Sequence, residues 1–349
     1  MNPSPLVSVV MPVYDAAEYL EQSVNSILKQ SLRDFEFIIV DDGSTDDSPK
    51  ILDHYQELDS RVRVLHQENS GIGISLNRAM AIAAGKYIAR MDSDDISLAK
   101  RLSKQAAFME SHPEIGICGT PCRYFGDRRG VGRPVTESAK IKSKLLFWPV
   151  MIHPTVMMRR QLIVDKGLFY RADFKEGEDY ELWFRFSQCC RMANMREPLV
   201  LVRMHDDQKH RCFDDSQDEW GNRVRREAIR ALGIEPSRED IELHLSLCRR
   251  GFRKSRDYVN RVEDWLCRLL DANERSRVLD TDTLAQVLFE CWCPVCAFAD
   301  ESILWRCRKL TGSRLHVGYR GLLRGCTSFG ARRVLRSLKR CVTGDFSKR

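Results

Sequence analysis

The chain has 349 residues, of which 43% are hydrophobic and 30% are charged, as is ordinary for a globular protein of one or two domains. Its net charge of +7 is concentrated at one end, because residues 301–349 hold 13 Lys and Arg against 2 Asp and Glu. The 13 cysteines are scattered and odd in number, which excludes a small disulfide-stapled module and favours free thiols in a reducing cytosol.

Four short apolar runs rich in β-branched residues lie in the first hundred residues: Leu6–Val13, Phe35–Val40, Val62–Leu65 and Tyr87–Met91. Such runs are typical of strands buried on both faces of a parallel sheet. The stretches between them have helical spacing, as at Tyr19, Leu20, Val24, Ile27 and Leu28. The alternation predicts an α/β fold, with a mostly parallel sheet and flanking helices, in which ligands bind at the carboxyl ends of the strands.

The pattern becomes mixed after Gly116. We expect a strand around Ile152–Met158, a helix from about Asp179 to Cys189 and a strand over Pro198–Val202. From about Arg211 onward the sequence is helical and rich in Arg. It therefore predicts an α/β domain over residues 1–210 and a mostly helical, basic region over residues 211–349.

No signal peptide and no membrane span are expected. The N-terminus has no charged segment followed by a long apolar one, and the longest apolar stretch, residues 284–299, is short and contains Glu290 and Pro294. These features favour a cytoplasmic protein.

Three cysteines of that stretch, Cys291, Cys293 and Cys296, could supply sulfur ligands to a structural zinc ion. Such an ion would need Cys267 or Cys307 as its fourth ligand. Packed thiols are the favoured interpretation.

Acidic residues follow two of the predicted strands. Asp41 and Asp42 come directly after one, and Asp92, Asp94 and Asp95 come directly after another. Closely spaced carboxylates at a strand end suit Mg²⁺ or Mn²⁺ held jointly by protein and phosphate oxygens.

Each acidic group also has a simpler interpretation. Asp95 or Ser97 would cap a helix beginning near Leu98, and Ser44 or Asp46 would cap the helix after the first acidic pair. A third pair, Glu178 and Asp179, sits in the first turn of its predicted helix, where acids are commonly favoured. A helix cap does not explain three acids among residues 92–95, and the joint occurrence of the three groups carries the argument for a ligand site.

Taken together, these stretches resemble the inverting family 2 glycosyltransferases, which have the GT-A fold. The matching stretches are Val7–Tyr14, Val40–Asp46, Asn69–Gly71, Gly85–Ile88, Asp92–Asp95, His153–Pro154, Gly177–Tyr180 with Trp183, and Arg203–His205. They cover about residues 5–210 in the family's order and spacing.

The resemblance implies a nucleoside diphosphate sugar as donor, with a UDP-sugar favoured. The nucleotide-binding positions that it implies are Pro12, Val13, Tyr14, Asp41, Asp42, Asn69 and Asp92. Among them, Asp42 matches the acid that bonds the base, and Asp41 supports the loop.

The resemblance also implies a divalent metal and a general base. Asp94 matches the direct ligand of Mn²⁺ or Mg²⁺, Asp92 faces the ribose or the metal, and His205 approaches the metal or diphosphate. Asp179 matches the base that deprotonates the acceptor hydroxyl, so that one displacement inverts the anomeric carbon.

Two positions depart from the family pattern: Asp15 stands where many members have Asn, and Leu76 stands where many have Arg. The Gln-x-x-Arg-Trp signature of processive members is absent, which favours adding one sugar per event. The expected acceptor is a glycan or a lipid-linked saccharide of cell-envelope polysaccharide.

Near the end of the chain, Val334, Leu335, Leu338, Cys341 and Val342 recur at helical spacing. Arg332, Arg333, Arg336, Lys339 and Arg340 fall on the opposite side. The pattern predicts either peripheral contact of residues 301–349 with anionic lipid on the inner face of the membrane, or a helix packed on the protein. No nucleic-acid-binding motif accompanies the charge.

Other functions fit the sequence less well. A dinucleotide-binding dehydrogenase would need G-x-G-x-x-G after the first strand, and a sugar-nucleotide pyrophosphorylase would need a Gly-rich basic loop there. That loop reads Pro12-Val-Tyr-Asp15. A non-catalytic nucleotide-sugar-binding protein or an acidic-site signalling domain is the remaining alternative.

Overall fold

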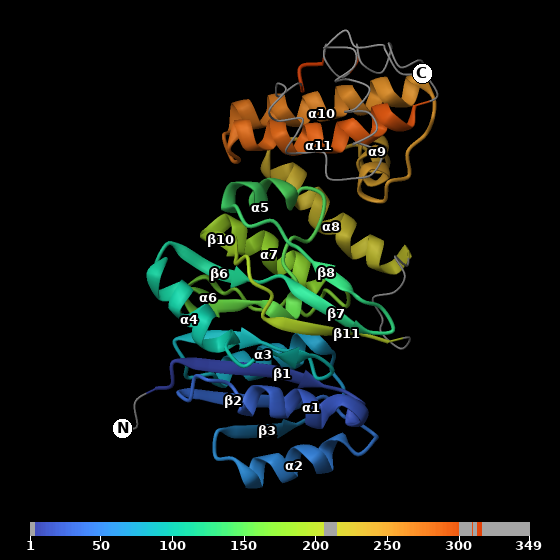
Figure 1. Ribbon diagram of the computed structural model, residues 1–349. Coiled ribbons are helices and arrows are strands. Elements are labelled where there is room, and N and C mark those ends of the chain that lie inside the picture. Colours follow the sequence, from blue (N-terminus) through green and yellow to red (C-terminus); the bar gives the residue numbers. More distant parts are fainter. Residues whose placement is uncertain (1–3, 206–214, 300–308, 310–312, 316–349) are drawn as a thin grey trace, which may run out of the picture. The chain divides into compact units, whose positions relative to one another are not determined.

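The computed structural model describes residues 4–205, 215–299, 309 and 313–315 (Figure 1). The chain separates into two compact units. The first comprises the described residues up to Ile141 together with Pro149–Gly221, and the second comprises Lys142–Trp148 and the described residues from Asn222 onward. The division at residue 210 stays a prediction. The expected amphipathic helix near the end of the chain lies outside the described residues.

The first unit contains a seven-stranded sheet, which confirms the predicted α/β class. In spatial order its strands are β10 (Arg191–Asn194), β6 (Ile115–Gly119), β9 (Met157–Arg159), β4 (Tyr87–Arg90), β1 (Val7–Val13), β2 (Phe35–Asp41) and β3 (Val62–His66). All neighbours pair in parallel except β9, which runs antiparallel to both β4 and β6. The sheet is therefore mostly parallel, as the four N-terminal runs predicted.

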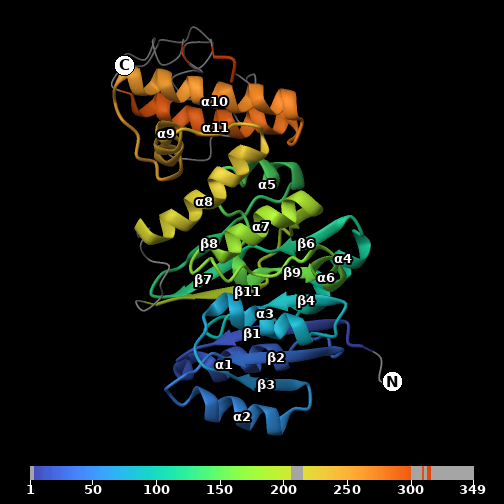
Figure 2. The ribbon, with the colours of Figure 1, turned by 180° about the vertical axis from the view of Figure 1, so that it is seen from behind.

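Helices cover both faces of this sheet. The apolar sides of α1 (Ala17–Leu28), α2 (Ser48–Leu58) and α4 (Arg101–Ser111) join one core cluster with alternate residues of β1 and β2. Helix α3 (Ile72–Ile82) contacts β1 and β2 through buried residues outside that cluster, and the view from behind shows it on the opposite face (Figure 2). Burial of these amphipathic faces explains why the helical spacing occurs between the strands.

Strand β1 lies between β2 and β4 but extends beyond the end of β4. The two pair only over Val7–Val10, so Pro12 lies where β4 has already ended. A proline is tolerated there because no ladder hydrogen bond from its nitrogen is required. The ends of β2 and β4 thus flank the end of β1, which is where the sequence predicted ligand binding.

A second, four-stranded sheet was not anticipated. Its order is β5 (Ile96–Ser97), β11 (Val200–Met204), β7 (Cys122–Gly126) and β8 (Gly130–Gly132). Strand β11 corresponds to the predicted strand at Pro198–Val202. It pairs with β5, which directly follows Asp95.

Two local predictions named the right element but had the wrong bounds. Residues expected to form a strand from Ile152 instead form the 3₁₀ helix η1 (His153–Thr155) before β9, because Pro154 fixes φ and has no N–H for a ladder. The helix expected near Leu98 begins at Arg101, since β5 comes first. Ser97 therefore does not cap it, and its hydroxyl accepts a bond from Gln30 Nε2 instead.

Three further helices complete the described elements up to residue 189: α5 (Ser138–Lys144), α6 (Arg160–Lys166) and α7 (Glu178–Cys189). Helix α7 confirms the helix predicted at that position. The later helices are α8 (Asp215–Ala231), α9 (Arg238–Cys248), α10 (Arg256–Ser276) and α11 (Thr281–Phe298).

The second unit packs around His244 of α9. Its Nε2–H donates to the Leu146 carbonyl at 2.8 Å, and its Nδ1 accepts from the Trp265 indole at 3.2 Å, which fixes a neutral ring. Phe147 stacks on the ring, with centroids 4.5 Å apart. Burial lowers the pKa of His244 to about 4. The core of this unit thus contains a histidine that stays uncharged at neutral pH.

The three clustered cysteines of the sequence lie on α11 and are buried, and burial raises the pKa of Cys291 and Cys296. Throughout the described ranges, the acidic residues after β4 form the one close group of potential metal ligands. None of the described helices is both long enough and apolar enough to cross a bilayer.

Candidate active site

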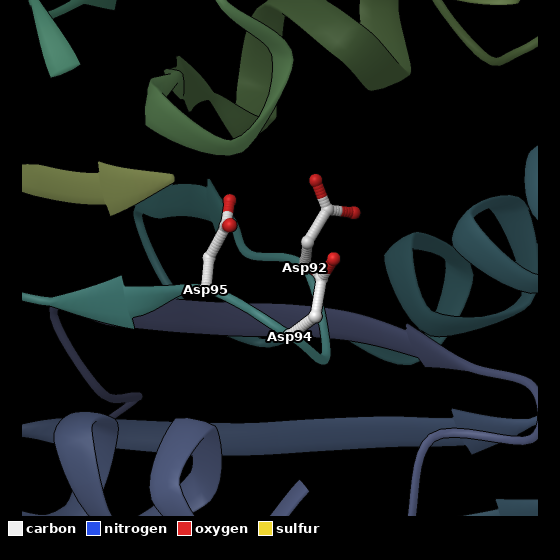
Figure 3. Close-up of side chains that lie close together, drawn as sticks. All are labelled: Asp92, Asp94 and Asp95. Atoms are coloured by element: carbon white, nitrogen blue, oxygen red, sulfur yellow. The ribbon is translucent and has the colours of Figure 1, made fainter. Parts of the chain in front are cut away.

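Three carboxylates gather at the end of β4. Asp92, Asp94 and Asp95, here called the acidic loop, place ligand oxygens within 4.8 Å of one another (Figure 3). Asp95 is buried, whereas Asp92 and Asp94 are 28% and 22% exposed. The acidic loop therefore presents two carboxylates that solvent can reach, Asp92 and Asp94, and one that is closed off from solvent, Asp95.

A buried arginine compensates the charge beneath the acidic loop. Arg90 is the last residue of β4, is 2% exposed, and donates from Nη1 to Asp92 Oδ2. Its own carbonyl accepts from Nη2 of the buried Arg101 at 2.6 Å. Sequence reasoning missed Arg90, although a charged residue inside the apolar run Tyr87–Met91 is itself a signal.

Strand β11 holds the other side of the acidic loop. The Arg203 N–H donates to Asp95 Oδ1 at 2.8 Å, and Arg203 Nε donates to the Asp94 carbonyl at 3.0 Å. His205 Nε2 lies 3.2 Å from Asp94 Oδ2, so the two residues predicted to share a metal lie together. Asp95 is thus an anchor for β11 and not the helix cap that the simpler interpretation offered. Arg203 lies in a stretch that matches the family, but its contacts with Asp94 and Asp95 had no signal in the sequence.

The acidic loop fits a divalent cation. Asp95 Oδ2 and His205 Nδ1 are buried and find no hydrogen-bond partner among the described residues. Burial, with the neighbouring charges of Asp92 and Asp94, raises the pKa of Asp95 well above its usual range. Crowded carboxylate oxygens of this kind are the donors that Mg²⁺ and Mn²⁺ prefer, and a cation would relieve their mutual repulsion.

A second acidic group lies on the other side of β1. Asp42, 4% exposed, follows β2 and accepts from Gln67 Nε2 at 2.6 Å, Ser70 N at 2.9 Å and Gly71 N at 2.8 Å. The carboxylate therefore ties β2 to the loop that opens α3. Asn69, in the same loop, is exposed.

The turn after Asp42 needs glycine. Gly43 has φ +77°, and a Cβ there would lie 2.7 Å from the Asn69 nitrogen. Both the left-handed backbone and the close approach of the two loops exclude a larger residue. The spacing of Asp42 and Asn69 therefore depends on this position.

The end of β1 lies beside this group. Val13 is buried and its carbonyl accepts from Asp42 N at 2.8 Å, while Tyr14 is 51% exposed. Asp15 has φ +45°, and its Oδ1 accepts from Thr45 N at 2.7 Å. Asn and Asp tolerate this left-handed conformation better than other non-glycine residues, which accounts for the family's Asn at this position.

The third pair opens α7. Glu178 is 9% exposed, and burial together with the charge of Asp179 raises the pKa of Glu178 to about 7. Asp179 is half-buried and accepts from Tyr180 N at 2.7 Å. Asp179, Glu178 and Asp92 all act electrostatically on the buried Tyr170, so the first turn of α7 and the acidic loop share one neighbourhood.

Asn77 links this neighbourhood to α3. Its side chain exchanges two hydrogen bonds with the Tyr170 backbone, at 2.7 and 2.8 Å. Leu76, where many family members have Arg, is fully buried and points into the core. The predicted residues thus fall into two groups: Asp92, Asp94, Asp179 and His205 around the acidic loop, and Pro12–Tyr14, Asp41, Asp42 and Asn69 at the ends of β1 and β2.

Comparison with known proteins gives consistent matches. The model of Glycosyl transferase family 2 matches residues 8–165. An uncharacterized glycosyltransferase of Haemophilus influenzae is 30% identical over 242 residues, covering 66% of this chain and 75% of that protein. The O-antigen biosynthesis glycosyltransferase WbnJ of Escherichia coli is 35% identical over 210 residues, covering 58% of this chain and 80% of that protein.

Solved structures agree on the fold. TarS 1–349 of S. aureus in complex with UDP-GlcNAc superposes with a TM-score of 0.57 at 17% identity, covering 98% of this chain and 93% of that one. In a longer TarS structure the match covers 52% of that chain. The chain is a glycosyltransferase of family 2 with a GT-A-type fold.

Proposed function

We propose that this chain transfers a single sugar from a UDP-sugar to a hydroxyl of a glycan or lipid-linked saccharide used in cell-envelope polysaccharide. The acidic loop carries the proposal, because its crowded carboxylates at the sheet edge suit a metal-bound diphosphate. Relatives support the acceptor class: WbnJ is named for O-antigen biosynthesis, and a teichuronic acid biosynthesis protein, TuaG of Bacillus subtilis, is 46% identical over 109 residues. The TarS complex with UDP-GlcNAc supports the donor class.

The donor's nucleoside would bind at the ends of β1 and β2. Pro12, Val13 and the exposed Tyr14 would border the base and ribose. The Asp42 carboxylate accepts three hydrogen bonds from the loop that opens α3. Its Oδ2 accepts only one of them, so a second lone pair of Oδ2 could accept a hydrogen bond from an N–H of the nucleobase. Asp41 would hold the loop after β2 in place, and the exposed Asn69 would border the nucleoside from the loop before α3.

The diphosphate would bind at the acidic loop with Mn²⁺ or Mg²⁺. Asp94 is the proposed direct ligand, with Asp92 and His205 beside it. A bound cation would neutralise charge that develops on the leaving diphosphate. Arg90 and Arg203 keep the loop in place, from β4 and β11 respectively.

Asp179 is the proposed general base. It is more exposed than Glu178, so an acceptor hydroxyl reaches it more readily. The raised pKa of Glu178 keeps much of that neighbour protonated near neutral pH, so it competes less for the proton. Deprotonation of the acceptor as it attacks opposite the leaving group gives inversion in one step.

A panel of nucleotide sugars with Mn²⁺, read by release of nucleoside diphosphate, tests the proposal. One UDP-sugar should be consumed, and Asp179→Asn should lose about three orders of magnitude in turnover while still binding UDP. Asp282→Asn makes the same change in the first turn of α11 and should keep full turnover. Near-normal turnover by Asp179→Asn would remove it from the mechanism. Binding of UDP without turnover of any sugar would favour a binding-only protein.

Contact of residues 301–349 with anionic lipid on the cytoplasmic face stays part of the proposal. Its support is the charge of that segment, 13 Lys and Arg against 2 Asp and Glu. Flotation with anionic liposomes, with and without those residues, tests it. Equal flotation of both proteins would end the idea.

A further inference from the structure

One histidine at the nucleotide edge is held between two carboxylates. His66 ends β3, and its Nδ1 lies 2.8 Å from Asp41 Oδ2 while its Nε2 lies 3.0 Å from Asp53 Oδ1. Asp41 is 4% exposed at the end of β2, whereas Asp53 of α2 is 59% exposed. The ring thus joins three elements of the sheet edge where the donor is proposed to bind.

This geometry requires a charged ring. A neutral imidazole carries one N–H, and its second nitrogen would direct a lone pair at a carboxylate. Only the imidazolium donates to both acids at once. The hydrogen bond with Asp41 raises the pKa of His66 above its ordinary 6.5, the bond with Asp53 adds to it, and partial burial acts in the opposite direction.

The charged groups that contact His66 come from three neighbouring elements. They are Asp41 on β2, Asp53 on α2 and Arg78 on α3, whose Nη1 lies 3.3 Å from the His66 carbonyl. Arg78 faces the backbone and not the ring, and it also donates to Gln67 Oε1 at 2.9 Å. Because two carboxylates contact the ring and the Arg78 guanidinium contacts only the backbone of His66, the imidazolium is the favoured form.

The contact between His66 and Asp41 is linked through Gln67 to Asp42, the residue proposed to bind the nucleobase. Asp41 Oδ1 accepts from Ser44 N at 3.1 Å, and the Asp41 carbonyl accepts from Gln67 N at 3.0 Å. Gln67 in turn donates from Nε2 to Asp42 at 2.6 Å. Loss of the imidazolium would remove one bond from this chain of contacts and leave the Asp41 carboxylate without the cation that it contacts.

We propose that His66 is a positioning residue for donor binding, acting as an imidazolium that clamps β2, β3 and α2 behind Asp42. The inference rests on the proposed function, since it concerns the nucleotide site. The clamp exists below the raised pKa of His66 and is lost as pH rises through it. Donor affinity should therefore fall over that range, without any change in the residues that touch the nucleotide.

The test measures UDP binding by calorimetry with Mn²⁺ between about pH 6 and about pH 9. His66→Gln is the reference, because its amide can bond one carboxylate at every pH and because UDP's own titration cancels in the comparison. The ratio of wild-type to His66→Gln affinity should fall about fivefold across this range. His54→Gln, an exposed histidine on α2, is the matched control and should follow the wild type.

Two further measurements separate this role from a structural one. The ring protons of His66 should titrate by NMR at the same pH at which the affinity ratio changes. Asp53→Asn should move both transitions to lower pH, since one of the two carboxylates is gone. A ratio that is flat with pH, or a ring that titrates near 6.5, would overturn the inference. If the wild type binds no nucleoside diphosphate at any pH, the proposed function itself fails.

Discussion

Replacement of Arg90 by methionine removes a buried guanidinium while keeping an unbranched side chain of similar length. Arg90 is 2% exposed and pairs with Asp92, which is 28% exposed. Breaking a buried pair by removing one partner costs about 3–5 kcal/mol, because the remaining charge is left uncompensated. Since Asp92 keeps contact with water, we take the lower end, about 3 kcal/mol.

The assay is thermal unfolding in EDTA, so that no metal replaces the lost charge. A loss of about 3 kcal/mol corresponds to a melting temperature lowered by about 10 °C for a unit of this size. Arg63→Met, on the exposed side of β3, is the matched control and should change the unfolding free energy by less than about 0.5 kcal/mol.

A double-mutant cycle isolates the pair. Asp92→Asn in the Arg90→Met background should cost less than the sum of the two single changes by about 1 kcal/mol or more, because the two residues contact each other. Additive losses, or an Arg90→Met protein that melts within about 2 °C of the wild type, would refute this account of the acidic loop.

Three other substitutions have expected effects. Asp42→Ala should lower the unfolding free energy by about 3 kcal/mol in urea titrations and abolish UDP binding, because three N–H donors lose their acceptor. Gly43→Ala should cost about 2 kcal/mol and weaken UDP binding, given φ +77° and the 2.7 Å approach to Asn69. His244 has a folded pKa lowered from 6.5 to about 4, so its contribution is present above 6.5 and is lost as pH falls toward 4. The free energy of unfolding of the second unit, measured by urea titration, should be about 3 kcal/mol lower at pH about 4 than above pH 6.5. His244→Gln should lack this pH dependence.

Each of these three predictions would be contradicted by one result. An Asp42→Ala protein with normal stability would mean that the loop of residues 67–71 does not depend on that carboxylate. Normal UDP affinity in Gly43→Ala would show that the spacing of the two loops is not critical. Equal acid sensitivity of His244→Gln and wild type would show that another group controls acid unfolding.

The strands and the acidic groups were predictable because their signals are local. The runs of β1, β2, β3 and β4 are short, apolar and bounded by polar residues, and the structure confirms all four to within a residue or so. The acids at the ends of β2 and β4 follow those runs directly. Their location at one sheet edge then follows from parallel pairing alone.

What could not be predicted depends on contacts between residues distant in sequence. Arg203 bonds Asp95 across 108 positions, so that nothing near Asp95 distinguishes an anchor for β11 from a helix cap. His66 gave no signal either, because its partners Asp41 and Asp53 meet it only after β2, β3 and α2 have packed. The strand expected around Ile152–Met158 begins only at Met157 for a local reason, the proline at position 154.

The most direct test of the central claim is a crystal structure grown with UDP and Mn²⁺ and measured at the manganese absorption edge. The account predicts an anomalous peak among the carboxylates of the acidic loop, at bonding distance from Asp94. The diphosphate of UDP should coordinate the ion at that peak, and the uracil base should lie beside Asp42. A peak elsewhere, or UDP bound away from the ends of β1 and β2, would contradict it.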